Sequence, residues 1–229
     1  MKNPASFPVR RHTLALITGL LLFTGCITIE ENYTFKKNGS GTMEYVVDLS
    51  ELGELMDSMK DMGGEKSSSD KLELGQNADA LKGIAGISGV KTSEKNWVKR
   101  ISFKFKDLTA LNAALNVLLP DSTNTNKEFF AWEDNVLVRR NNRHAVELGA
   151  GMSADGEGDA QENKEAAEGM LETMKYKYSF AFAKPIAQMD IAGGMQEERQ
   201  GTRKVRLETD FSAIMKDPET LDLRISLDN

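Results

Sequence analysis

The chain has few of the residues that build crosslinks, metal sites or common catalytic centres. Its 229 residues include one cysteine, two histidines and five prolines. One cysteine cannot form an intrachain disulfide, and so few cysteines and histidines cannot supply a Cys/His zinc site. With 29 basic and 35 acidic residues, the net charge of −6 gives no electrostatic basis for binding nucleic acid. We therefore expect no metal, no cofactor and no nucleic-acid partner.

No catalytic motif replaces these missing residues. The sequence contains neither a phosphate-binding Gly-x-x-x-x-Gly-Lys-[Ser/Thr] loop nor a Gly-x-Ser-x-Gly nucleophile turn. His144 follows Asn141, Asn142 and Arg143 at the edge of a segment that we interpret as a loop, so we expect an exposed histidine without a role. We expect no catalytic residues, and therefore no enzyme.

Residues 1–25 have the features of a secretory signal. Their start is positively charged, with Lys2, Arg10 and Arg11. An apolar run of ten residues, 14–23, follows and is too short to span a bilayer of ~30 Å. It ends in Phe23-Thr24-Gly25-Cys26, which is similar to the bacterial lipobox, in which small residues precede a lipidated cysteine. We expect cleavage before Cys26 and acylation of Cys26; an ordinary signal peptide or a short anchor with a chance cysteine is the alternative.

Cleavage there would leave an acidic protein that only its lipid holds on the membrane. Residues 26–229 carry 26 basic and 35 acidic side chains, a charge of −9, so this part should not lie flat on an anionic leaflet. Acyl chains such as palmitate on Cys26 would supply the membrane affinity. Ile27 follows the cysteine, in place of the Asp that retains enterobacterial lipoproteins in the inner membrane. We expect the outer membrane, facing the periplasm, ahead of the inner membrane or the cell surface.

Apolar periodicity predicts a mixture of strands and helices. The clearest signal is a β-hairpin over residues 27–49, which turns at Asn38-Gly39-Ser40-Gly41 and whose alternation is broken only by Glu31. Further strands are expected at 87–93, 97–106, 128–132, 135–140, 176–183, 203–209 and 221–227. Helices are expected from about residue 50 to 62, at 77–84, from 108 to 119 and at 162–174.

Three strands pass into helices through the same kind of junction. The junctions are Asp48-Leu49-Ser50, Asp107-Leu108-Thr109 and Asp210-Phe211-Ser212. A short oxygen-bearing side chain at such a position accepts hydrogen bonds from the free amides of the first helical turn. The repeated pattern predicts an α+β fold with helices packed on one face of a largely antiparallel sheet.

The composition divides the chain into four parts. Residues 1–25 are the signal, and 26–140 form an N-terminal α+β part. Residues 141–161 are rich in Gly, Asp and Asn and are interpreted as a mobile loop or boundary. Residues 162–229 supply a helix and strands that complete the same domain or form a second small one. Trp97 and Trp132 are candidates for ligand platforms or membrane contacts, although packing within hairpins is the commoner role.

The lipobox, the hairpin and the segment GTMEYVVDLSEL (41–52) are similar to those of bacterial lipoproteins of unknown function. More loosely, they resemble the LppM-type lipoprotein domain, an α+β module of bacterial envelopes. YSFAFAKPIAQMD (178–190) and RKVRLETDFSAIMKDPETLDLRISL (203–227) have a similar strand–Pro–turn–strand arrangement. The resemblance implies a periplasmic or surface module that binds lipid-like ligands or partners and is not an enzyme.

Three functions follow as hypotheses. The first is a non-enzymatic, lipid-anchored module that binds an envelope lipid, glycan or apolar ligand in a cavity between sheet and helices. The second is an accessory or scaffold lipoprotein that docks a larger envelope complex through an apolar patch or an open sheet edge. The third is an envelope hydrolase, which requires a cleft with strongly shifted pKa values.

Overall fold

The structure is a computed structural model that describes residues 27–54, 78–123, 125–153 and 168–228. The strands of a larger sheet are β1 (Thr28–Phe35), β2 (Gly41–Asp48), β3 (Ile87–Lys95), β4 (Val98–Phe105), β7 (Lys175–Phe182), β9 (Gln196–Arg199) and β10 (Lys204–Asp210). Those of a smaller sheet are β5 (Phe130–Glu133), β6 (Val136–Arg139), β8 (Ile186–Ile191) and β11 (Leu223–Leu227). The helices are the 3-10 helix η2 (Ala78–Gly83) and the α-helices α2 (Leu108–Leu118), α3 (Arg143–Ser153) and α5 (Phe211–Lys216).

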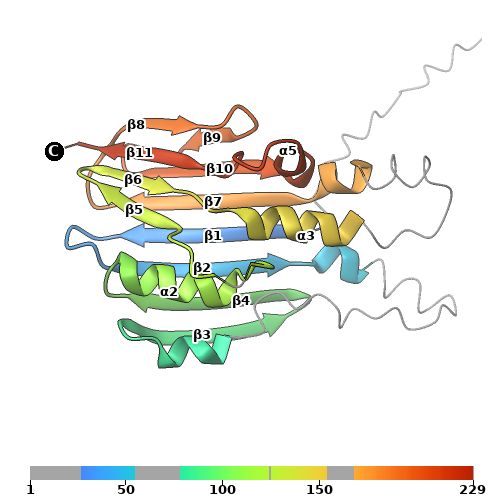
Figure 1. Cartoon of the computed structure of the whole chain (residues 1–229), viewed down its shortest axis with the longest axis horizontal. Coiled ribbons are helices and arrows are strands. Elements are labelled where there is room, and N and C mark those ends of the chain that lie inside the picture. The colour runs from blue at the N-terminus through green and yellow to red at the C-terminus, as the bar shows by residue number, and fades with distance from the viewer. Residues whose placement is uncertain (1–26, 55–77, 124, 154–167, 229) are drawn as a thin grey trace, which may run out of the picture.

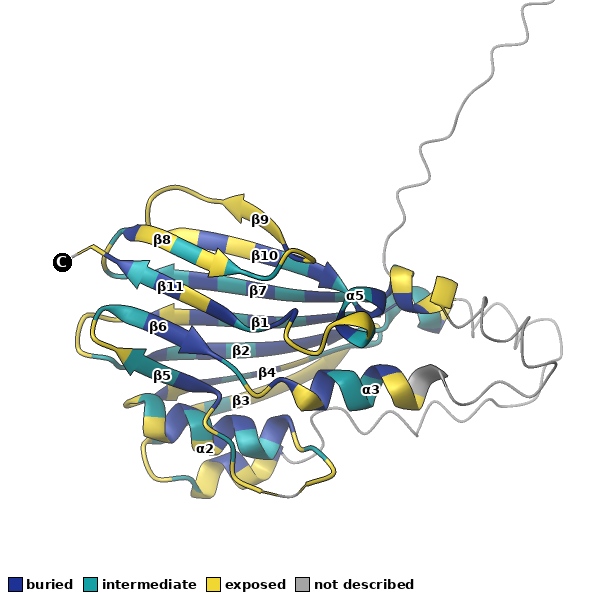
Figure 2. Cartoon of the chain, turned by 45° about the horizontal axis from the view of Figure 1, so that its top comes forward, coloured by how far each residue is buried: buried dark blue, intermediate teal, exposed yellow. Residues whose placement is uncertain are grey.

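Both sheets are built mainly from antiparallel pairs. The larger sheet has seven strands in the order β3-β4-β2-β1-β7-β10-β9, and the smaller has four in the order β5-β6-β11-β8. The pair β1–β7 is parallel. The smaller sheet and the helices α2, α3 and α5 all lie on the same face of the larger sheet (Figures 1 and 2). The predicted α+β class is confirmed, and the smaller sheet is an addition that the sequence did not predict.

The core lies between the larger sheet and this cover. Alternate residues of β1 and β7 point into it, so that Tyr33, Phe35, Tyr176 and Phe180 are all at most 2% exposed. On the opposite face, polar side chains pair across strands, for example Lys177 with Glu208 at 3.5 Å. Within the described ranges, Met170 is the one large hydrophobic side chain that is exposed. One face of the larger sheet is therefore dry and the other polar, which is why the alternation in the sequence was clear.

The three strand-to-helix junctions form as expected. The carboxylate of Asp107 accepts a hydrogen bond from the amide of Ala110 at 2.9 Å, and that of Asp210 accepts one from Ala213 at 2.8 Å. Asp48 accepts from the amide of Ser50 at 3.0 Å, where the helical residues 50–54 begin. The rest of that first predicted helix lies outside the described residues.

The N-terminal and C-terminal parts of the chain share both sheets. Strand β7 lies between β1 and β10 in the larger sheet, and β11 lies between β6 and β8 in the smaller one. The two parts therefore interleave, and residues 27–228 contain every described strand and helix and the whole described core. The signal 1–25 and Cys26 lie outside the described residues. No described helix has the length and apolar character needed to cross a bilayer.

The prediction of a loop over residues 141–161 is wrong for the first half of that segment. Residues Arg143–Ser153 form α3, while 154–161 lie outside the described residues. Gly149 is one of the glycines on which the loop prediction rested, but it lies within α3, where this helix packs closely against α5. A Cβ atom added there would lie 2.9 Å from Sδ of Met215 and 3.2 Å from Cδ1 of Phe211. Here glycine permits helix packing, which sequence alone does not distinguish from a turn.

Candidate functional site

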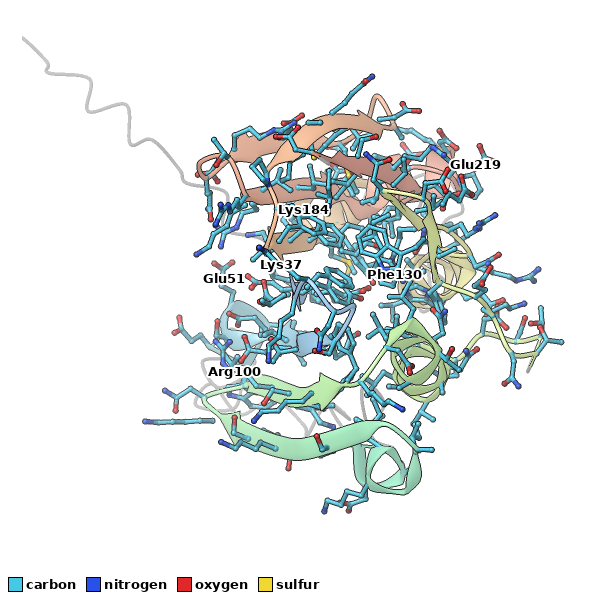
Figure 3. All side chains as sticks on the ribbon, turned by 90° about the vertical axis from the view of Figure 1, so that its left-hand side faces the viewer. Lys37, Glu51, Arg100, Phe130, Lys184 and Glu219 are labelled. Carbon is cyan, nitrogen blue, oxygen red and sulfur yellow. The ribbon has the colours of Figure 1, made fainter. Side chains whose placement is uncertain are left out.

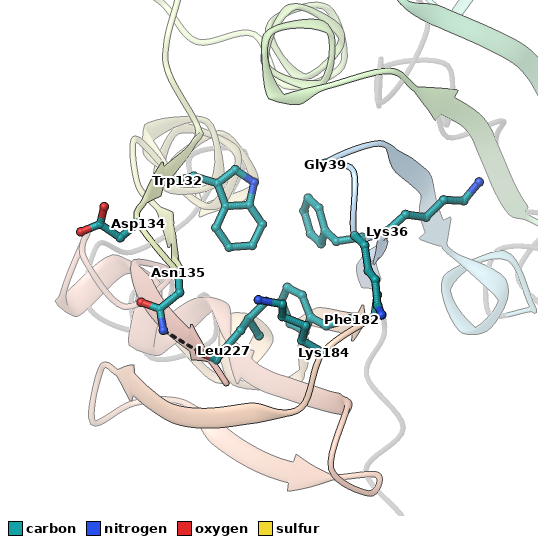
Figure 4. A pocket seen from close by; sticks show the side chains of 11 residues that line it. Lys36, Gly39, Trp132, Asp134, Asn135, Phe182, Lys184 and Leu227 are labelled. Carbon is teal, nitrogen blue, oxygen red and sulfur yellow. Dashed lines mark hydrogen bonds between the residues drawn. The ribbon is translucent and has the colours of Figure 1, made fainter. Parts of the chain in front are cut away.

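A pocket of about 510 Å³ opens at the end of the molecule where β1 and β7 finish. We call it the end pocket; it is lined by Phe35, Lys36, Lys37, Gly39, Trp132, Asp134, Asn135, Phe182, Ala183, Lys184 and Leu227. These residues come from the β1–β2 turn, the β5–β6 hairpin, the β7–β8 connection and the end of β11 (Figure 4). The volume lies within the roughly 300–1,000 Å³ typical of small-molecule sites.

Aromatic rings form the floor of the end pocket. The rings of Phe35 and Phe182 stack with centroids 5.5 Å apart, and Trp132 meets Phe35 edge-on at 6.1 Å. Phe182 stacks in turn on Phe180, deeper in the core, at 6.2 Å. The floor is thus the open end of the aromatic core. A ligand that covers it removes apolar surface from water chiefly at Trp132, which is partly exposed, because Phe35 and Phe182 are only 2% and 6% exposed.

Three lysines surround the opening. Lys36 and Lys37 belong to the β1–β2 turn, and Lys184 lies in the β7–β8 connection; all three are exposed. Figure 3 looks onto this end of the molecule and shows Lys37 and Lys184 close to one another. Within the described part of the chain, none of the three forms an ion pair. Asp134 is the one acidic residue of the lining, so the opening is positively charged on a chain that is negative as a whole.

Hydrogen bonds between the four segments hold the opening in shape. The amide of Ala183 donates to the carbonyl of Phe35 at 3.1 Å, which fastens the β7–β8 connection to β1. Asn135 bonds twice with Leu227, through its side-chain amide at 2.6 Å and through its carbonyl at 3.0 Å. The pocket is preformed, so a ligand need not order these loops in order to bind.

A second polar assembly lies inside the core, between the two sheets. Glu31 of β1 and Arg139 of β6 are both 0% exposed. Nη2 of Arg139 lies 3.0 Å and 3.1 Å from the two carboxylate oxygens of Glu31, and Tyr33 and Tyr176 donate hydrogen bonds to the same carboxylate. Burial lowers the pKa of Arg139 on its own, but Glu31 and the tyrosines outweigh it and hold that pKa well above its usual value. Arg139 is thus held in the core through Nη2, while its Nη1 is buried without a hydrogen-bond partner among the described residues.

The network continues to both sides of this pair. Nε of Arg139 donates to the hydroxyl of Tyr178 at 3.2 Å, and Tyr178 donates to Asn142 at 3.3 Å. Nε2 of His144 lies 3.0 Å from the hydroxyl of Tyr176. Because that hydroxyl donates to Glu31, Nε2 of His144 must carry a proton and donate here. Its Nδ1 is buried without a hydrogen-bond partner among the described residues. Burial, with Arg139 nearby, lowers the pKa of His144 to about 3.

The structure corrects the expectation for His144. We expected an exposed loop residue, but His144 lies on α3 and is 8% exposed.

The two tryptophans lie at different ends of the molecule. Trp132 lines the end pocket, whereas Trp97 lies against Gly53, near the opposite end of β2. Among the described residues, no group of three or more His, Cys, Asp or Glu side chains could hold a metal ion.

The sequence analysis missed the three lysines of the end pocket. The available signal was that all three stand in connections between strands, Lys36 and Lys37 directly after β1 and Lys184 two residues after the end of β7. Using that signal requires knowing that β1 and β7 are parallel neighbours, so that their ends lie together. Cys26, the residue expected to be acylated, lies outside the described residues; the next residue, Ile27, is 1% exposed, and its carbonyl accepts a hydrogen bond from the amide of Lys175 at 2.9 Å. The first strand, β1, therefore begins two residues after Cys26.

No protein-family model and no curated protein sequence matches this chain. Among solved structures, the chain is similar to the folded domain of LppM from Mycobacterium tuberculosis, determined by NMR. The TM-score is 0.45 and the sequence identity 8%, over 91% of this chain and 93% of that one. The resemblance suggested by the sequence is thus also found by comparison of structures.

Proposed function

We propose that this chain is a lipid-anchored protein of the bacterial cell envelope that binds an envelope lipid, a glycan or an apolar ligand in the end pocket, without catalysing a reaction. Acyl chains on Cys26 would provide the anchor, and the outer membrane facing the periplasm is the proposed location. The observation that carries the proposal is the end pocket itself, a preformed opening with an aromatic floor.

The direction of the chain supports this arrangement. The fold begins at Ile27, and β1 then runs the length of the sheet to Phe35, which lines the end pocket. At ~3.3 Å per residue, the eight residues of β1 span about 26 Å. An anchor on Cys26 would therefore hold the opposite end of the sheet at the membrane and leave the end pocket open to the surrounding solution.

The chemistry of the lining favours binding over catalysis. Among the described residues, the lining of the end pocket includes one carboxylate, that of Asp134, and no histidine, cysteine or serine. The buried His144 has its Nε2 committed to Tyr176 and does not line the pocket. A hydrolase would need a nucleophile or a general base within reach of a bound ligand.

Native mass spectrometry of the full-length protein, extracted from its host with mild detergent, tests the proposal. We expect the mass of acyl groups at Cys26 and a non-covalently bound ligand of small-molecule mass. Trp132→Ala should lose the bound ligand, whereas Trp97→Phe, at the other end of the molecule, should keep it. A protein without lipid at Cys26, or a ligand retained equally by both variants, contradicts the proposal.

One observation favours the alternative of an accessory lipoprotein that docks a larger complex. Strand β3 is a nine-residue edge of the larger sheet and is mostly exposed, so a partner strand could add to it. Against this, Met170 is the one large hydrophobic side chain exposed in the described ranges, which leaves little apolar surface for a stable interface. A stoichiometric complex with another envelope protein in the same spectrum, without a bound small molecule, would favour the docking role.

A further inference from the structure

We propose that the ligand of the end pocket is an anionic amphiphile, whose acidic headgroup binds Lys36, Lys37 and Lys184 while its apolar part covers the aromatic floor. This inference rests on the proposed function and specifies the ligand class of the same pocket. It follows from the charge at the opening, the layout of polar and apolar groups, and the way the other candidate ligands fit.

The charge at the opening is the first step. Lys36 and Lys37 are adjacent in one turn, and Lys184 comes from a different segment that lines the same pocket (Figures 3 and 4). Three ammonium groups with no ion-pair partner in the described part repel one another, and a bound anion relieves that repulsion. The chain as a whole is acidic, so this local excess of positive charge does not follow from composition.

The layout of the pocket is the second step. The lysines are exposed, while Phe35 and Phe182 beneath them are 2% and 6% exposed. A ligand with a charged end and an apolar end can contact both the lysines and the aromatic floor only if its headgroup points outward. Lysine ammonium groups are compact charges on flexible stems, which suit a phosphate or carboxylate and do not require the planar geometry that arginine imposes.

The other ligand classes fit less well. A neutral sugar could stack on Trp132 and bind the lysines or Asp134 through its hydroxyls, but it would leave the positive charge of the opening uncompensated. A quaternary ammonium ligand could bind the aromatic faces, but three lysines would repel it and Asp134 alone would attract it. A purely apolar ligand would gain nothing from the lysines. The anionic amphiphile uses both zones of the pocket.

The test uses three probes that share a twelve-carbon chain and differ in headgroup. They are dodecyl phosphate, dodecyl maltoside and dodecyltrimethylammonium, each kept below its micelle concentration. The protein starts at residue 26 with Cys26→Ser, which retains every described element. Trp97→Phe leaves Trp132, in the pocket lining, as the one tryptophan and thus the fluorescence reporter.

We expect dodecyl phosphate to bind about tenfold more tightly than dodecyl maltoside, and the cationic probe to bind most weakly. The preference should shrink as salt is raised, because exposed charges are screened. The triple variant Lys36→Gln, Lys37→Gln, Lys184→Gln should lose the preference and still bind the maltoside. Lys95→Gln, at an exposed position of β3, should retain it. All these lysines are exposed, so circular dichroism should show an unchanged fold.

The outcomes separate this inference from the proposed function. If none of the three probes changes the Trp132 signal, the proposed function itself fails. If all three bind equally, or if the triple variant keeps the preference for phosphate, the pocket binds apolar chains but the anionic inference is overturned. Sedimentation with phosphatidylglycerol or phosphatidylcholine vesicles then distinguishes the sources. Lysine-dependent binding to phosphatidylglycerol alone identifies a bilayer lipid, whereas binding of monomeric dodecyl phosphate without vesicle binding identifies a free amphiphile.

Discussion

Arg139 of β6 and Glu31 of β1 form an ion pair inside the core, with Nη2 of the arginine 3.0 Å and 3.1 Å from the two carboxylate oxygens. The two residues are 108 positions apart, and they join the smaller sheet to the larger one. The guanidinium carbon also lies 4.9 Å from the ring centroid of Phe130 and 5.2 Å from that of Tyr178. Burying two charges costs about as much as their attraction returns, so we expect the pair to contribute more to the alignment of the two sheets than to net stability.

Breaking this pair from one side should be costly. Arg139→Met leaves the carboxylate of Glu31 buried with only tyrosine hydroxyls to satisfy it, and we expect a loss of about 3–5 kcal/mol in the free energy of unfolding. Glu31→Gln should cost a similar amount, because it leaves the guanidinium uncompensated. Urea unfolding followed by circular dichroism measures both.

The double variant separates pairing from packing. Glu31→Gln with Arg139→Met removes both charges and leaves an amide that can accept from the tyrosines, so the two losses should not add. We expect a coupling of more than about 1 kcal/mol in the double-mutant cycle. Lys82→Gln, which breaks an exposed pair with Asp79, should leave the unfolding midpoint unchanged. Additive losses would show that the two side chains act only through packing.

His144 should make stability depend on pH. Its pKa is lowered from 6.5 to about 3 by burial, with Arg139 nearby, so the unfolded chain binds a proton more readily than the folded one. Stability is therefore complete above pH 6.5 and falls as the pH drops from there toward 3. Between pH 7 and pH 5 this single group should account for a loss of about 2 kcal/mol.

His144→Gln, which keeps a donor for the hydroxyl of Tyr176, isolates this effect. The free energy of unfolding of the variant should fall less between pH 7 and pH 5 than that of the native protein, by about the same 2 kcal/mol. The test compares only how steeply the free energy of unfolding changes with pH in the two proteins. A constant difference in stability between them therefore does not affect the result. Parallel slopes would mean that folding does not lower the pKa of His144.

The elements that the sequence predicted best are those with local causes. The alternation of β1 and β2 and the caps at Asp107 and Asp210 depend on neighbouring residues, and all of these form as expected. The second sheet was not predicted, because β6 pairs with β11, more than 80 residues later in the chain. The alternation of apolar residues in one strand does not identify the strand with which it pairs. The order of the strands could therefore not be predicted from periodicity.

The candidate site was harder to predict from the sequence for the same reason. The end pocket exists because the parallel pairing of β1 and β7 brings Lys37 and Lys184 to one end, and no local pattern encodes that pairing. Glu31 did give a signal, since it alone interrupts an apolar face. A charged residue at such a position points to a buried partner, but the sequence does not identify that partner as Arg139. His144 was misplaced because its segment was taken for a loop.

The proposed acylation of Cys26 leads to a prediction that does not depend on the fold. Cys26→Ser should abolish incorporation of radiolabelled palmitate, and because the chain has no other cysteine, no label should remain. The native protein should partition into the detergent phase of Triton X-114. The mature form of the variant, if it is produced, should partition into the aqueous phase. Label that persists in the variant would exclude Cys26 as the site of acylation.

Two glycines of α3 should respond in opposite directions to substitution. A Cβ atom added at Gly151 meets nothing within 4 Å. Gly151→Ala should therefore stabilise the protein by about 0.5–1 kcal/mol, through the lower entropy of the unfolded chain and a better helix propensity.

A Cβ atom added at Gly149, in contrast, lies 2.9 Å from Sδ of Met215 and 3.2 Å from Cδ1 of Phe211. Gly149→Leu should therefore force α3 and α5 apart, at a net cost of about 1–2 kcal/mol. Thermal unfolding of the two variants measures the contrast. A stabilising Gly149→Leu would mean that the two helices do not pack as closely as described, and it would remove the physical reason for a glycine at that position.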